Sequence, residues 1–131
     1  FIEKKELYSS LKEFGFQYGL TFQPLEWLKL KNPFVLSYFN LPKENERNAK
    51  DYLLHPSLID GALQTAVAAQ RFNSNVDTPQ QDLKLPFAIN VIEFFQDLPQ
   101  QGHILVRQDH PSHISMQQYD LQILDSQGQV C

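Results

Sequence analysis

A single carboxylate stands in the most apolar part of the sequence. Asp60 is the only fully charged residue in the run LLHPSLIDGALQTAVAAQ, which extends from Leu53 to Gln70. An ionised carboxylate is unfavourable in an apolar environment, so burial there is expected to raise the pKa of Asp60. A carboxylic acid that stays protonated near neutral pH can donate its proton to a leaving hydroxyl. Asp60 is therefore a candidate general acid.

Gln64 follows Asp60 by four residues, which places both side chains on one face of a helix. Its neutral amide could orient the carboxyl group without lowering the pKa as strongly as a lysine would. Gly61 is expected to leave room for a ligand, although it weakens a helix by roughly 1 kcal/mol relative to Ala. A structural interpretation is also open, because the helix dipole favours an aspartate in the first turns of a helix.

The element that positions these residues is expected to be a helix from Pro56 to about Phe72. Proline suits the first turn of a helix, and His55 immediately before it suits a cap or a pocket wall. Apolar residues cover more than one face of this segment, which predicts a central helix rather than one at the surface. A second, amphipathic helix is expected over residues 3–14, ended by Gly15.

Strands are predicted on both sides of the central helix. Two precede it, at Gln23–Lys31 and Phe34–Leu41, and three follow it, starting at Leu85, His103 and Met116. The charged segment 42–51 and the polar segment 73–82 are predicted to be loops. Consecutive strands after the helix disfavour a parallel sheet. The expected class is therefore α+β, with a curled antiparallel sheet wrapped around a central helix, which is the hot-dog fold.

The overall composition narrows the possible functions. The chain has 131 residues, 11 basic against 15 acidic, which fits one domain and argues against nucleic-acid binding. His55, Asp60 and Gln64 interrupt the longest apolar run, so no membrane span is expected. One cysteine, Cys131, allows no intrachain disulfide, in keeping with a reducing, cytoplasmic compartment. The chain starts at Phe1 and ends within a predicted strand, so we expect a piece of a longer protein.

Several motifs resemble those of dehydratase domains in modular polyketide synthases. HPSLIDGALQ, residues 55–64, is similar to their HPxLLDxxxQ/H motif. GFQYGLTF is similar to their GxxYGPxF motif: Tyr18, Gly19 and Phe22 match, and Leu20 replaces the proline. LPFAI, residues 85–89, resembles their LPFxx segment, and DLQILDSQGQV resembles their late hairpin. The matches come in family order, from about residue 7 to the end.

The resemblance implies half of a double hot-dog. Such domains remove water from a β-hydroxyacyl thioester carried on the phosphopantetheine arm of an acyl carrier protein. In the family, the first hot-dog supplies a histidine in an HxxxGxxxxP motif that takes the α-proton. The second supplies an aspartate that protonates the departing β-hydroxyl. By position Asp60 is that acid and Gln64 is its hydrogen-bonding partner.

The base is not expected in this chain. None of the histidines, His55, His103, His110 and His113, has Gly and Pro at the motif's spacings. Residues 1–131 therefore resemble the second, C-terminal half, which should be inactive alone. The implied partners are the N-terminal hot-dog with its histidine, the acyl carrier protein and neighbouring synthase domains. No cofactor is implied beyond the arm that carries the substrate.

The remaining candidate residues line the substrate path in this interpretation. They are Tyr18, Phe22, His55, Leu85, Pro86 and Phe87. No metal site is expected, because the pair His110 and His113 has no obvious further ligands. Two other functions stay open: a dehydratase-like domain that isomerises or cyclises the chain, and a non-catalytic hot-dog that binds acyl chains or supports the synthase.

Overall fold

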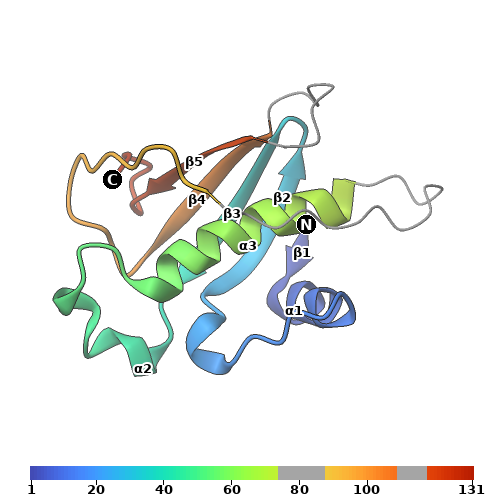
Figure 1. Ribbon diagram of the computed structural model, residues 1–131, viewed down its shortest axis with the longest axis horizontal. Helices are drawn as coiled ribbons and strands as arrows, with labels where there is room; N and C mark the ends of the chain where they lie inside the picture. Colours follow the sequence, from blue (N-terminus) through green and yellow to red (C-terminus); the bar gives the residue numbers. More distant parts are fainter. Residues whose placement is uncertain (74–87, 109–117) are drawn as a thin grey trace.

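The core of the molecule is a curled antiparallel sheet. The computed structural model describes residues 1–73, 88–108 and 118–131. Within these, five strands pair in chain order (Figure 1). They are β1 (Ile2–Glu3), β2 (Leu25–Lys31), β3 (Phe34–Asn40), β4 (Gln101–Gln108) and β5 (Tyr119–Leu124). Each neighbouring pair is antiparallel, as the sequence predicts.

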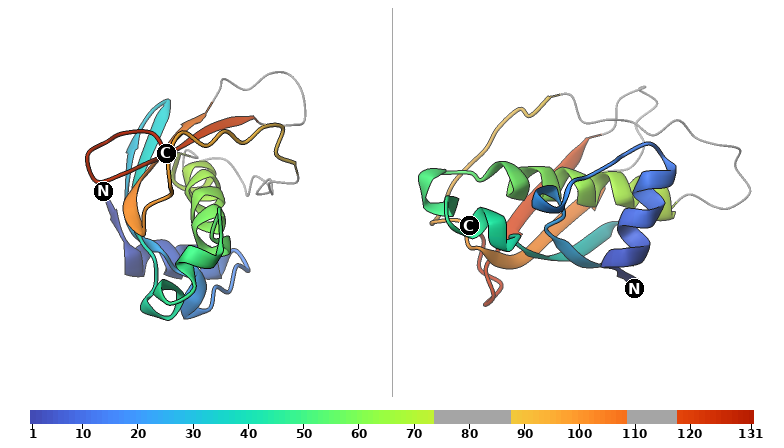
Figure 2. Two further views of the ribbon diagram at one scale, coloured as in Figure 1. Left: turned by 90° about the vertical axis from the view of Figure 1, so that its left-hand side faces the viewer. Right: turned by 90° about the horizontal axis from the view of Figure 1, so that it is seen from below.

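A long helix, α3 (Pro56–Asn73), packs along one face of this sheet. Figure 2 shows the helix lying to one side of the curved strands. Val35, Ser37 and Phe39 of β3 are buried, and Leu36 and Tyr38 between them are less so, as the period of a strand requires. The alanines of α3 are buried in the same hydrophobic core as Val35 and Phe39. This arrangement confirms the expected α+β class and hot-dog fold.

The leading helix, α1 (Lys4–Glu13), covers one end of the core. Leu7 and Leu11 are fully buried, and Gly15 takes a φ of +91° just beyond the helix. The Gly15 N–H donates to the Lys12 carbonyl at 2.9 Å, and the Phe16 N–H donates to the Leu11 carbonyl at 3.0 Å. These bonds close the helix around a left-handed glycine, as predicted.

The segment 42–51 is more ordered than the predicted loop. It forms a short helix, α2 (Lys43–Glu46), and a 3₁₀ turn, η2 (Ala49–Asp51). Asn45 is buried and donates from Nδ2 to the Thr21 carbonyl at 2.6 Å, which ties α2 to the segment before β2. The loop prediction was wrong because this contact joins residues distant in sequence, and such a contact leaves no mark on local charge.

The strand predicted to start at Leu85 is also wrong over the part that is described. Residues 88–95 form no strand, and Ile89, Val91 and Phe95 are exposed. A strand requires a neighbouring backbone. Among the backbone bonds between described residues, this segment has one only at its end, where the Phe95 N–H donates to the Cys131 carbonyl at 2.7 Å. Leu85, Pro86 and Phe87 lie outside the described residues.

The last predicted strand is confirmed from Tyr119 onward, and Met116 lies outside the described residues. Tyr119, Leu121 and Ile123 are partly buried, whereas Asp120 and Gln122 are exposed. The turn after it places Gly128 at a φ of +80°, and Val130 then forms a single bridge with Leu124. Among the described helices, none has the length and apolar character needed to cross a membrane.

Candidate active site

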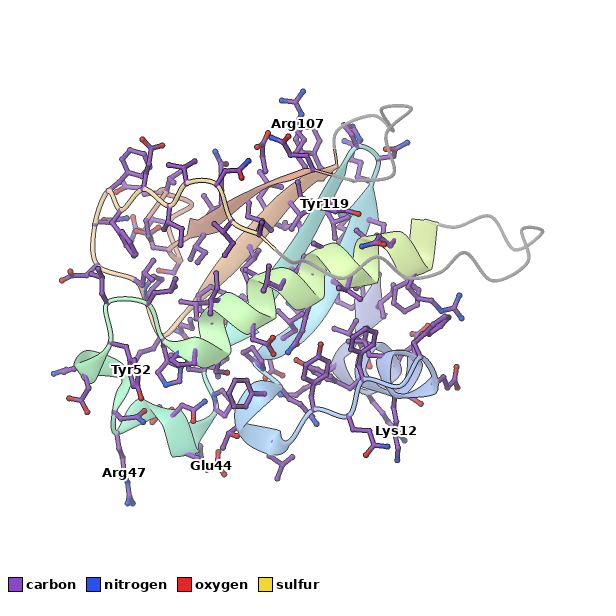
Figure 3. The ribbon with its side chains drawn as sticks, in the orientation of Figure 1. Lys12, Glu44, Arg47, Tyr52, Arg107 and Tyr119 are labelled. Carbon is purple, nitrogen blue, oxygen red and sulfur yellow. The ribbon has the colours of Figure 1, made fainter. Side chains whose placement is uncertain are left out.

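Asp60 and Gln64 meet on α3. Gln64 donates from Nε2 to Oδ2 of Asp60 at 2.7 Å, so the predicted pairing across one helical turn is present. Gln64 is almost completely buried, with 1% of its surface exposed, and Asp60 is partly buried. In Figure 3 the helix that carries both residues crosses the middle of the molecule, and α1, marked by Lys12, lies to one side of it.

The Gln64 amide has three hydrogen-bond partners among the described residues, and their chemistry fixes its orientation. Nε2 also donates to the Phe22 carbonyl at 2.9 Å, and Oε1 accepts from the Tyr8 hydroxyl at 2.8 Å. A carbonyl can only accept, so the NH₂ group must face Phe22 and Asp60. The Tyr8 oxygen itself accepts from the Leu25 N–H at 3.1 Å. We call these five groups the Gln64 network.

Burial governs the ionisation of the network. Desolvation raises the pKa of Asp60, and the hydrogen bond from Gln64 partly opposes this shift. Burial also raises the pKa of Tyr18 to about 12, with a further contribution from the negative charge of Asp60. The pKa of Tyr8 is raised even more strongly, chiefly by burial. Tyr8 is therefore a neutral hydroxyl that can donate to Gln64. The raised pKa of Asp60 favours the protonated form of its carboxyl group.

Glycine is required at position 61 for a different reason from the one predicted. A Cβ atom at this position would lie 2.7 Å from Cγ of Pro24, the residue before β2. The space beside Gly61 is therefore occupied by Pro24 and is not left for a ligand. The close approach brings α3 against the segment before β2, where the Phe22 carbonyl and the Leu25 N–H join the network.

Tyr18 lies next to the Gln64 network, and Phe22 contributes its carbonyl to it. Both residues are on the segment between α1 and β2. The Tyr18 ring meets the Tyr8 ring edge-on, with 6.1 Å between centroids. Phe22 belongs to a 3₁₀ turn, η1 (Leu20–Phe22); its carbonyl binds Gln64, and its side chain is 40% exposed. The structure thus brings both predicted residues to the acid.

His55 caps α3. Its Nδ1 accepts a hydrogen bond from the Ser57 N–H at 3.1 Å, and its Nε2 lies 3.2 Å from Oδ1 of Asn48. This pattern requires a neutral ring with the proton on Nε2. Burial lowers the pKa of His55, which favours that neutral form. The capping role that the sequence allowed is therefore present.

Tyr8 is the residue that the sequence did not single out. It precedes Gln64 by 56 residues and sits on the predicted amphipathic helix beside Leu7. It also lines a pocket of about 390 Å³ between α1 and the segment before β2, together with Lys12, Phe16 and Tyr18 among others. In the sequence, the position of Tyr8 at the edge of the apolar face of a predicted helix was the one local indication that its hydroxyl is buried.

Among the described residues, potential metal ligands do not cluster. No group of three or more potential ligands from His, Cys, Asp and Glu gathers there. His110 and His113, the pair weighed in the sequence, lie outside the described residues.

Comparison with known proteins shows the family of this chain. Residues 2–131 match the family described as "Polyketide synthase dehydratase N-terminal domain". The polyketide synthase PksM of Bacillus subtilis (strain 168) is 26% identical over 132 residues, which are 99% of this chain and 3% of PksM.

Solved dehydratase structures share the fold. A dehydratase domain of a trans-AT polyketide synthase from Brevibacillus brevis is 25% identical, with a TM-score of 0.78 over 98% of this chain and 42% of that chain. An inactive aspartate-to-asparagine mutant of the CurK dehydratase is 28% identical, with a TM-score of 0.78, over 98% of this chain and 44% of that chain. An inactive histidine-to-phenylalanine mutant of the same dehydratase matches similarly, at 27% identity.

This chain spans less than half of those dehydratase chains. The family match extends over nearly all of its residues, and the fold agrees with that of the solved dehydratases. The chain belongs to the polyketide synthase dehydratase family.

Proposed function

We propose that this chain is the acid-bearing half of a dehydratase that removes water from a β-hydroxyacyl thioester on an acyl carrier protein. The observation that carries the proposal is the pairing of Asp60 with the buried Gln64 amide, in a setting that raises the pKa of the acid. A protonated carboxyl group is what elimination of a poor leaving group requires.

The reaction needs two groups that face each other. A base removes the proton from the α-carbon, the new C=C bond forms, and the C–O bond to the β-hydroxyl breaks. Asp60 gives its proton to that oxygen, so that water leaves and a carboxylate remains. The proton taken by the base then returns to Asp60 through solvent. Each turnover thus restores both groups.

The assignment to the second half rests on residue chemistry. The matching family's description refers to the N-terminal domain, whereas this chain carries an aspartate motif and no HxxxGxxxxP histidine. In the CurK dehydratase the mutated histidine and aspartate are further apart in sequence than the 131 residues of this chain. A segment of this length could contain only one of them. Asp60 supports the aspartate side, so the other hot-dog would supply the histidine.

The test uses the intact dehydratase domain and a β-hydroxyacyl chain on its carrier protein. Mass spectrometry should show loss of one water with the wild type and none with Asp60→Asn. Asp97→Asn, at an exposed position, is the matched control and should retain the reaction. Full dehydration by Asp60→Asn would refute the acid assignment. A wild-type product of unchanged mass would instead favour an isomerase or a scaffold.

A further inference from the structure

We propose that Tyr8 is a positioning residue for the general acid: it holds the Gln64 amide in the orientation that keeps the acidic proton of Asp60 on Oδ1. The inference rests on the proposed dehydratase function and deepens it. It assigns a role to a helix, α1, that carries none of the residues predicted to act in catalysis.

The direction of each hydrogen bond follows from the donor before it. The Leu25 N–H can only donate, so the Tyr8 oxygen accepts from it at 3.1 Å. The Tyr8 proton then points to Oε1 of Gln64, 2.8 Å away. With Oε1 so engaged, both protons of Nε2 are directed to the Phe22 carbonyl and to Oδ2 of Asp60.

This orientation selects the oxygen of Asp60 that carries the proton. Because Oδ2 accepts from Gln64 at 2.7 Å, a proton on Oδ2 would point at the N–H group. The acid form therefore carries its proton on Oδ1, where it is available for transfer. If the amide turned over, Oε1 would face Asp60 and could accept that proton, which would then be held within the protein.

Tyr8 and Phe22 both oppose that rotation. Two carbonyl oxygens facing each other, those of Phe22 and Gln64, would repel, so loss of the Tyr8 hydroxyl should release the amide only in part. A single net hydrogen bond corresponds to about a tenfold effect. We expect a loss of rate of about this size, smaller than the loss from removing Asp60 itself.

The pH dependence of the dehydration rate gives a second, independent test of the role of Tyr8. The Gln64 N–H lowers the pKa of Asp60 relative to burial alone. Rotation of the amide removes that donor and lets Gln64 accept from the acid form instead, so the pKa should rise. Within the described part of the chain, two other titratable groups lie beside the network. Tyr18 has its pKa raised by burial and by the charge of Asp60, and Glu26 of β2 acts on Tyr8 and is paired with Lys4 at 2.8 Å. Neither is altered by the substitution.

The experiment measures single-turnover dehydration against pH in the intact dehydratase domain. Tyr8→Phe is compared with wild type, Gln64→Met and the double variant, and thermal unfolding checks that each is folded. Tyr38→Phe is the matched control, because its hydroxyl donates to exposed Gln101 on the far face of the sheet.

Tyr8→Phe should lower the maximal rate about tenfold and move the basic limb of the profile to higher pH. Added to Gln64→Met it should lower the rate no further, because Tyr8 acts through Gln64. Tyr38→Phe should match the wild type. A wild-type rate for Tyr8→Phe, a rate loss with an unmoved limb, or multiplicative losses in the double variant would each overturn the proposal.

Asp60→Asn, run in parallel, separates the two claims. If Asp60→Asn is inactive and Tyr8→Phe behaves as the wild type, only the role of Tyr8 is wrong. If Asp60→Asn keeps the wild-type rate, the proposed function itself fails.

Discussion

Gln64 donates to Asp60 across one turn of α3, with 2.7 Å between Nε2 and Oδ2. The bond joins a nearly fully buried amide to a partly buried acid. An amide orients the carboxyl group while leaving burial as the main influence on its pKa. The same burial that favours proton donation should therefore make ionised Asp60 unfavourable for stability.

Asp60→Asn should stabilise the fold at neutral pH. Because the folded-state pKa of Asp60 lies above 3.8, the native state retains the proton to higher pH than the unfolded chain does. Its favourable contribution is thus present at low pH and is lost as pH rises through the folded pKa. In urea unfolding, the variant should have a larger free energy of unfolding than the wild type at neutral pH. This difference should become smaller towards about pH 4. A variant that is less stable at neutral pH would contradict the burial argument.

Gly61→Ala should destabilise the fold, although alanine favours a helix. The gain in helix propensity is about 1 kcal/mol, but the new methyl would come 2.7 Å from Pro24, and overpacking costs about 1–3 kcal/mol. We expect a net loss in the free energy of unfolding, measured by denaturant. Gly19→Ala is the control, since nothing lies within 4 Å of a Cβ there and the backbone φ is −67°. Equal stability of the two variants would show that the contact with Pro24 relaxes freely.

A buried hydroxyl pair joins the helix to the sheet. Oγ of Ser37 on β3 lies 2.8 Å from Oγ1 of Thr65 on α3, and Thr65 also donates to the Gly61 carbonyl at 3.0 Å. Thr65→Val leaves Ser37 without this partner and should cost about 1–3 kcal/mol. Adding Ser37→Ala should recover part of that loss in denaturant unfolding. Strictly additive losses would mean that the two hydroxyls do not depend on each other.

Local pattern was enough to predict much of this fold. α3 begins at Pro56 as predicted, because proline fits a first turn, and the apolar surface of this helix required a central place. The pairing of Asp60 with Gln64 followed from helical spacing alone. The alternation from Tyr119 to Ile123 likewise identified β5.

Contacts between distant residues were not predictable in this way. Tyr8 reaches Gln64 over 56 positions, and Pro24 explains Gly61 only once α3 has packed against it. The segment 88–95 has the composition of a strand, but strand formation depends on a partner backbone that its own residues do not specify. Sequence pattern therefore located the pair Asp60 and Gln64 and did not identify Tyr8, which binds Gln64 from another helix.

His55 should make stability depend on pH in the opposite sense to Asp60. Burial lowers its folded-state pKa below 6.5, so the unfolded chain binds the proton more readily. The hydrogen bond from the Ser57 N–H to His55 is therefore intact above pH 6.5. It is lost as pH falls through the folded-state pKa of His55. His55→Asn keeps a capping side chain that does not titrate, so its unfolding free energy should fall less on acidification than that of the wild type. Identical pH profiles would show that the cap does not depend on the neutral ring.

If Asp60 is the general acid, it delivers its proton from a carboxyl group whose pKa is raised by burial. The most direct measurement combines titration of the Asp60 carboxyl by carbon NMR with the pH dependence of single-turnover dehydration, both in the intact domain. We expect an Asp60 pKa above 3.8 and a rate that falls, as pH rises, at that same pKa. An Asp60 that titrates at its ordinary value, with dehydration unaffected by its ionisation, would contradict this assignment.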